Sequence, residues 1–552
     1  MVLLGGCAAG ALALLLPARW RLRASLAAGC LLRLWVACRS PLILQEWPLN
    51  DDSHYYYTIA WNLAHGGGLR HDSVHVTTGF QPLFLLLITP VFAIARDKTA
   101  AITMALLVQA AVGVGAALCL RGLAARIGGS VAGDLAIGAW AVAPLFLTHD
   151  LSGLETNLAL GLVSAAGWLW LRLRADGAIP DRRSAAAVGA LCGLAFLARI
   201  DTVFLSPILA AGLLAGAATA VPFRERLLRA GILCGAALTL AAPWLAWNLA
   251  AIGSILPSSG QAVRFLSQAY GFHFLGGNGA GTRDYFEIGH PPALYYWETL
   301  RKAARDIWGV ADAAFPVMPG LLLVACAVGA RGNDFLRRLR PLGFLAALVL
   351  VQLTLYCGWI FGQWFFDRYL TPWGLLWIAT VAAAVAALAG SAAPPRRAAR
   401  AGVALIAAAC IGLLAVRSLR RIDSLNDGRT SAYYEAAVWV NTHIPDGATI
   451  GAFQTGIFGY YLERRFYGLD GKINVDALHA MQEKRIDEYV DGEGIDYVMD
   501  WPWLLRDLFV RRSRDPGFLE RGELVWEGRY RAYRIRPDAH PILSSSTAVS
   551  TR

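Results

Sequence analysis

The stretch NDDSHYYYTIAWNLAHGGGLRHDSVHVTTGFQ, residues 50–81, places titratable side chains between long apolar segments. It joins two adjacent acids, Asp51 and Asp52, to a segment rich in tyrosine and tryptophan, then to three glycines and several histidines. Ionisable groups at a membrane boundary are expensive to desolvate, and neighbouring acids can have pKa values pushed apart for acid–base chemistry. The stretch is therefore either a functional site or a solvated loop, and the rest of the sequence has to decide.

The composition indicates a membrane protein. Of the 552 residues, 56% are hydrophobic and only 16% are charged. Repeated apolar runs without the alternation of barrel strands predict transmembrane helices, because only closed hydrogen-bonded structures cross a bilayer. The net charge of +11 comes almost wholly from arginine, and the arginine clusters alternate along the chain as expected for cytoplasmic loops. We therefore expect the lipid bilayer and no nucleic acid as a partner.

The arginine clusters also predict the orientation of the spans. When these clusters are assigned to the cytoplasm, residues 45–81, the long polar segment 252–312 and the end of the chain lie outside. The short apolar segment 82–95 is interpreted as a helix at the outer interface. The prediction is a polytopic α-helical protein of the cell membrane with eleven spans, or twelve if residues 2–16 also cross.

Three regions are expected from the change in hydropathy near Arg417. Residues 1–417 form the membrane domain, residues 418–540 a small extracytoplasmic α/β domain, and residues 541–552 a disordered tail rich in serine and threonine. In the α/β domain, strands are predicted at 448–453, 466–470, 495–501 and 529–535, and helices at 433–442 and 476–491.

Acids and arginines at the ends of apolar runs gather on the predicted outer side. They are Asp51, Asp52, Asp150, Glu155, Arg199, Asp201, Arg264 and Arg368. The positive-inside rule concerns lysine and arginine and does not explain where acids lie. The segregation therefore favours a site at the outer membrane surface.

Five segments of the sequence, within residues 24–388, resemble the GT-C glycosyltransferases, of the protein mannosyltransferase or aminoarabinose transferase type. The segments are NDDSHYYYTIAWNLAHGGG, TTGFQPLF, HDLSGLET, ARID and FDRYLTP. The resemblance implies a membrane enzyme that takes a sugar from a polyprenyl-phosphate donor. It further implies that Asp51 is the catalytic base, with Asp52 as the alternative. Glu155 matches the second outer acid, and Asp150 is its local competitor.

Inverting sugar transfer needs a carboxylate to deprotonate the acceptor, and positive charge or a metal at the leaving phosphate. The guanidinium groups of Arg368, Arg264 and Arg199 can bind a phosphate with two hydrogen bonds. Two of these arginines have neighbouring acids and can instead form structural ion pairs, Arg199 with Asp201 and Arg368 with Asp367. Two further residues, His54 and Tyr55, are expected to contact substrate. The acceptor can be a lipid, a glycan or a protein.

A divalent cation (Mg, Mn or Ca) is a possible cofactor, with Asp51, Asp52 and Glu155 as its oxygen ligands. Zinc is not expected at the histidines, because the Gly-rich context makes a helix that would pair His71 with His75 unlikely. The alternative functions are a transporter or flippase for a lipid-linked saccharide and a non-catalytic scaffold. Transporters usually carry their charges near mid-bilayer, whereas here the acids are expected at one face.

Overall fold

The computed structural model describes residues 16–175, 178–215, 221–274, 293–360, 366–389 and 397–536. The possible span at residues 2–16, the centre of the 252–312 segment and the predicted tail 541–552 lie outside the described residues, apart from residue 16.

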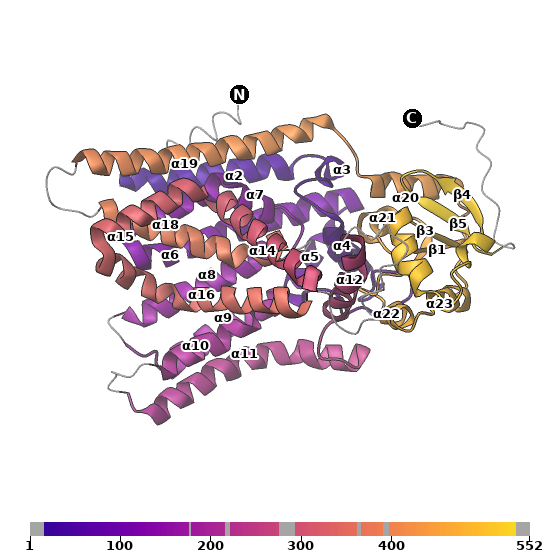
Figure 1. Ribbon diagram of the computed structural model, residues 1–552, viewed down its shortest axis with the longest axis horizontal. Coiled ribbons are helices and arrows are strands. Elements are labelled where there is room, and N and C mark those ends of the chain that lie inside the picture. Colours follow the sequence, from indigo (N-terminus) through magenta and orange to yellow (C-terminus); the bar gives the residue numbers. More distant parts are fainter. Residues whose placement is uncertain are drawn as a thin grey trace.

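The membrane part is a bundle of helices, several of which run along the long axis of the molecule (Figure 1). Its first half contains α2 (Ala18–Ala37), α3 (Pro41–Leu44), α4 (Asp51–Ala64), α5 (Pro82–Ile94), α6 (Lys98–Val142), α7 (Pro144–His149), α8 (Thr156–Leu173) and α9 (Arg182–Ala198). Its second half contains η2 (Ile200–Phe204), α10 (Leu205–Leu214), α11 (Phe223–Ile252), α12 (Ser258–Phe274), α14 (Ala293–Ala314), α15 (Val317–Leu339), α16 (Gly343–Leu355), η4 (Tyr356–Ile360), α17 (Phe366–Tyr369), α18 (Thr371–Ala389) and α19 (Arg397–Asp423).

Five helical stretches among the described residues are long and apolar enough to cross a membrane. They are Lys98–Val142, Phe223–Ile252, Val317–Ile360, Thr371–Ala389 and Arg400–His443. The polytopic helical membrane fold is thus confirmed, whereas the number of eleven or twelve spans stays a prediction.

Helix α6 is a hairpin of two arms. Gly129 has a φ of 74°, a conformation that glycine adopts without steric cost. Beyond it the chain folds back, since a Cβ atom on Gly133 would lie 3.1 Å from the carbonyl oxygen of Arg121. The apolar segments 100–120 and 131–148 therefore fall on separate arms.

The C-terminal domain contains a five-stranded sheet in the order β2-β1-β3-β5-β4. The strands are β1 (Thr449–Ala452), β2 (Arg465–Gly468), β3 (Tyr497–Asp500), β4 (Glu523–Glu527) and β5 (Arg531–Arg534). The first three are parallel, and β5 and β4 extend the sheet antiparallel. The small α/β domain is thereby confirmed, and β4 is a strand that the sequence did not predict.

The helices of this domain are α20 (Ala432–His443), α21 (Gly456–Tyr461), α22 (Val475–Gln482), α23 (Ile486–Gly492) and α24 (Pro502–Leu504). The single helix expected at 476–491 is wrong, because Lys484 has a φ of 55° and separates α22 from α23. The domain lies at one end of the bundle, next to α4 and α12 (Figure 1). Gly456 packs directly on Asp51, so closely that a Cβ atom would lie 2.1 Å from the Asp51 carbonyl oxygen.

Candidate active site

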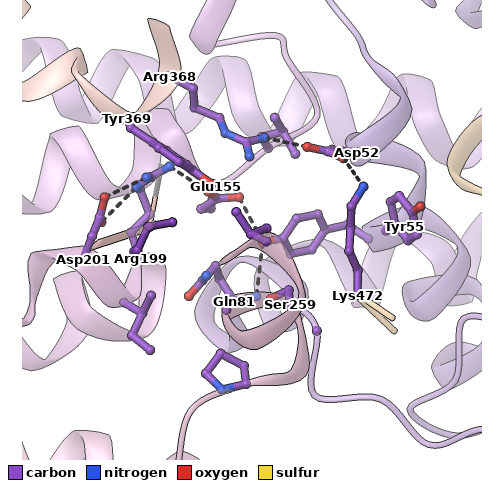
Figure 2. A pocket seen from close by; sticks show the side chains of 18 of the residues that line it. Asp52, Tyr55, Gln81, Glu155, Arg199, Asp201, Ser259, Arg368, Tyr369 and Lys472 are labelled. Carbon is purple, nitrogen blue, oxygen red and sulfur yellow. Dashed lines mark hydrogen bonds and ion pairs between the residues drawn. The ribbon is translucent and has the colours of Figure 1, made fainter. Parts of the chain in front are cut away.

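Two adjoining cavities lie where the C-terminal domain meets the bundle. The first has a volume of about 150 Å³ and the second about 390 Å³. Both are lined by Asp52, Leu154, Arg368 and Lys472, which therefore stand between them. The first cavity and its side chains are shown in Figure 2.

Asp52 lies at the junction of the cavities and faces two cations. Arg368 donates from Nη1 to Asp52 Oδ2 at 3.2 Å, and Lys472 Nζ lies 3.6 Å from Asp52 Oδ1 (Figure 2). Burial opposes ionisation of Asp52, but the charges of Lys472 and Arg368 outweigh it and lower the pKa of the carboxyl group. Asp367 Oδ1 accepts the backbone N–H of Arg368 at 2.8 Å, and the ion pair suggested between the two side chains stays a prediction.

Asp51 has a different environment from its neighbour. The cap of α4 places both acids in the first helical turn, because the Asn50 side chain accepts the backbone N–H of Ser53. Asp51 Oδ1 accepts the backbone N–H of Ile457 at 2.8 Å, while Oδ2 is buried with no hydrogen-bond partner among the described residues. Burial raises the pKa of Asp51 to about 7. Asp51 lines the second cavity.

Glu155 is held on the other side of the first cavity. Its carboxylate accepts Tyr56 Oη at 2.9 Å and Arg199 Nη1 at 3.0 Å. Arg199 also donates two hydrogen bonds to Asp201, at 3.1 and 2.7 Å, and Asp201 accepts Tyr356 Oη at 2.6 Å. Arg199 is thus ion-paired with both Glu155 and Asp201. The pair with Asp201 is the structural ion pair that the sequence suggested.

The backbone that carries Glu155 is fixed from the bundle. Gln109 accepts the N–H of Gly153 at 2.9 Å and donates to the carbonyl of Leu154 at 2.5 Å. Asp150, the local competitor of Glu155, is buried against the fully buried Arg33, at 2.6 Å from its Nε, and accepts Trp140 Nε1 at 2.8 Å. Asp150 is therefore part of the buried core of the bundle.

The two substrate contacts expected on α4 lie on different faces of the helix. Tyr55 lines the first cavity and donates to Asp470 Oδ2 at 3.0 Å. His54 is fully buried and packs against Tyr57 and Tyr460, with ring centroids 5.4 and 5.6 Å away. Burial lowers the pKa of His54 to about 3. The structure therefore places His54 in the core, outside the described lining of both cavities.

Arg264, on α12, is stacked on an indole ring. Its guanidinium carbon lies 3.7 Å from the ring centroid of Trp359. The neighbouring Val263 lines the first cavity, whereas Arg264 is not among the described residues that line either cavity. Its expected contact with the donor phosphate stays a prediction.

Lys472 is a site residue that the sequence analysis missed. It follows β2 in the C-terminal domain, and its Nζ also lies 3.4 Å from Asp470 Oδ2. Its carbonyl accepts the Oγ of Ser258 at 2.7 Å, and the N–H of Ser258 donates to Thr78 Oγ1 at 3.0 Å. The chain has few lysines, and this one follows the FYGLDG segment, which was the available signal.

The described residues do not form the metal site suggested for the three acids. Among the described residues there is no group of three or more histidine, cysteine or acidic side chains that could hold an ion. Asp52 faces two cations, Glu155 accepts an arginine and a tyrosine, and Asp51 Oδ1 binds a backbone N–H. The positive charge in the site comes from basic side chains.

The comparisons with known proteins agree with this architecture. The family model of a domain of unknown function, DUF8728, matches residues 404–541, and no curated protein sequence matches the chain. The chain is similar to solved structures of the oligosaccharyltransferase of Archaeoglobus fulgidus. The one tethered to an acceptor peptide has a TM-score of 0.58 at 13% identity, covering 89% of this chain and 70% of that one. The complex with Zn and sulfate has a TM-score of 0.56 at 15% identity, covering 90% and 71%.

A third solved structure is ArnT of Cupriavidus metallidurans bound to undecaprenyl phosphate. It has a TM-score of 0.51 at 13% identity and covers 94% of this chain and 98% of that one. The likeness extends over most of both chains and includes the membrane helices. This chain therefore has the fold of the GT-C superfamily of membrane glycosyltransferases.

Proposed function

We propose that the protein is an inverting glycosyltransferase that moves a sugar from a polyprenyl-phosphate donor to an acceptor hydroxyl at the outer face of the membrane. The observation that carries this proposal is the position of Asp52, Arg368 and Lys472 between two cavities. Such a junction lets a donor and an acceptor meet from opposite sides. The oligosaccharyltransferase and ArnT neighbours support the same class of reaction.

A third cavity supports a lipid-linked donor. It has a volume of about 310 Å³, lies between α9, α10 and α11, and has an apolar lining that includes Phe196, Val203 and Leu245. Ile200 lines both this cavity and the first one. A polyprenyl chain in the apolar cavity would therefore bring its phosphate toward Arg368 and Lys472. The undecaprenyl phosphate in the ArnT structure supports a donor of this type.

The two adjacent acids, Asp51 and Asp52, have different roles in this proposal. A general base is most effective when its pKa lies near the working pH, which suits Asp51 with a pKa of about 7. Asp52, whose pKa is lowered, holds Arg368 and Lys472 in place by charge. Glu155 is a positioning residue that fixes Arg199 and Tyr56 beside the first cavity.

In the proposed reaction, the acceptor oxygen attacks the anomeric carbon from the face opposite the phosphate. A bond forms between that oxygen and the anomeric carbon, and the bond from this carbon to the phosphate oxygen breaks. Asp51 takes the acceptor proton, and the polyprenyl phosphate leaves with its negative charge facing Arg368 and Lys472.

A divalent cation stays a prediction, because the three acids are engaged with other groups in this structure. Its use requires Asp52 to exchange Arg368 and Lys472 for an ion. Transfer measured with a chelator, then with added Mg²⁺, Mn²⁺ or Ca²⁺, tests this requirement.

The purified protein in lipid nanodiscs, supplied with a panel of radiolabelled polyprenyl-phosphate sugars and a glycan and lipid extract, tests the proposal. We expect one donor to be cleaved, with the label in the acceptor fraction and free polyprenyl phosphate released. A transporter or flippase would instead move an intact lipid-linked sugar across the bilayer of a proteoliposome. Intact movement without cleavage of the bond to phosphate would overturn the proposal.

A further inference from the structure

The second cavity lies between the bundle and the C-terminal domain. The bundle contributes Asn50, Asp51 and Ser152, and the C-terminal domain contributes Gln454 and Trp503. At about 390 Å³ the cavity falls in the range of roughly 300–1,000 Å³ that small-molecule sites occupy. It is therefore large enough to bind the end of an acceptor.

The lining of this cavity suits an uncharged ligand with many hydroxyl groups. Asn50, Thr148, Ser152 and Gln454 offer neutral hydrogen-bonding groups. Burial lowers the pKa of His149, which also lines the cavity, to about 4, so its ring is neutral at pH 7.

An anionic ligand is disfavoured by the acids in the same lining. Asp51 and Asp367 both line the cavity, and both cations in the lining, Arg368 and Lys472, face Asp52. The indole of Trp503 adds an aromatic surface of the kind that packs on the C–H face of a sugar ring. The combination of hydroxyl-binding groups, acids and one indole fits a neutral saccharide.

Asp51 provides the point at which such a ligand would react. Its buried Oδ2 has no hydrogen-bond partner among the described residues, and a buried oxygen without a partner destabilises the structure. Asp51 lines the second cavity, so a hydroxyl group bound there lies beside this side chain. A hydrogen bond from the hydroxyl group to the Asp51 carboxylate would align its proton with the base.

We propose that the second cavity is the acceptor site, that the acceptor is a neutral saccharide, and that Trp503 and Gln454 of the C-terminal domain bind it. The inference rests on the proposed glycosyl transfer and gives the C-terminal domain a direct part in substrate recognition. The reacting hydroxyl donates to the Asp51 carboxylate, and its oxygen forms the new glycosidic bond.

The test compares Trp503→Ala and Gln454→Ala with Trp526→Ala in the full-length protein in nanodiscs. Trp526 lies on β4 and stacks on Trp439 with ring centroids 4.5 Å apart, so it is a control for loss of an indole in the same domain. Donor affinity is measured by titration, and transfer to neutral oligosaccharides gives kcat and the acceptor KM. Gln454→Ala removes few packing atoms, which guards against a folding defect in the Trp503 variant.

We expect both cavity variants to raise the acceptor KM about fivefold, which corresponds to about 1 kcal/mol of lost aromatic contact for Trp503 and of a lost hydrogen bond for Gln454. Donor affinity should stay within about twofold, and Trp526→Ala should match the wild type. An unchanged acceptor KM in both cavity variants, or transfer by the wild type only to a peptide or an anionic acceptor, would overturn the inference alone. A wild type that neither binds nor cleaves any polyprenyl-phosphate sugar would overturn the proposed function instead.

Discussion

Lys472 Nζ lies 3.6 Å from Asp52 Oδ1, so a side chain of the C-terminal domain reaches the first turn of α4 in the membrane part. The contact joins residues that are far apart in the sequence. It makes the C-terminal domain part of the candidate active site.

Replacement of this lysine should weaken donor binding. Lys472→Met keeps an unbranched side chain but removes the charge, and hydrogen bonds to charged groups contribute about 1.5–3 kcal/mol. We expect the Kd for a polyprenyl-phosphate sugar to rise by about tenfold or more. Lys484→Met, in the turn between α22 and α23, is the matched control. Equal donor affinity in the two variants would refute the assignment of Lys472.

Replacement of Arg368 by lysine should impair donor binding and sugar transfer. Arg368→Lys keeps the charge but loses the planar fork that binds a phosphate with two hydrogen bonds. We expect weaker donor affinity and slower transfer, measured by titration and by initial rates. Arg264→Lys in the same assays tests the other arginine predicted from the sequence. If Arg368→Lys has wild-type affinity and rate, the donor phosphate lies elsewhere.

The pH dependence of transfer should report the ionisation of Asp51. Because burial raises the pKa of Asp51 to about 7, the carboxyl group is protonated and inactive as a base below that pH. The rate at saturating substrates should therefore rise between pH 5 and 8. The residual rate of Asp51→Asn should lack this rise, and a wild-type rate that does not change over this range would contradict the assignment.

Chemical labelling can test on which side of the membrane the site lies. Arg429 precedes α20 and is predicted outside, whereas Arg183 at the start of α9 is predicted inside; both are exposed. In intact cells, an impermeant thiol reagent should label Arg429→Cys above the background of the parent chain and should not label Arg183→Cys. The reverse pattern would place the site in the cytoplasm.

The sequence predicted much of the membrane side of the site. The spans return Asp52, Glu155, Arg199 and Arg368 to one region because each ends an apolar run. The prediction that His54 contacts substrate did not take the helical period of α4 into account. Residues 52, 55 and 56 are spaced i, i+3 and i+4 on α4 and line the first cavity, whereas residue 54 points to the core.

The contribution of the C-terminal domain was not predictable in the same way. The fall in hydropathy predicts a domain outside the membrane, but it carries no information on which surface docks against the bundle. That surface depends on close contacts, such as Gly456 against Asp51, that involve residues far apart in the chain. Lys472, Gln454 and Trp503 were therefore missed together.

The transfer rate of Asp51→Asn, with donor affinity measured on the same sample, tests the central claim most directly. The substitution keeps the size of the side chain and removes its basicity. We predict that the variant folds, binds donor as the wild type does, and transfers sugar about 10²- to 10⁴-fold more slowly, as expected for loss of a general base. Asp52→Asn should lose less. A near wild-type rate for Asp51→Asn would contradict this account: if Asp52→Asn is then inactive, the base is Asp52, and if both variants remain active, the proposed mechanism is wrong.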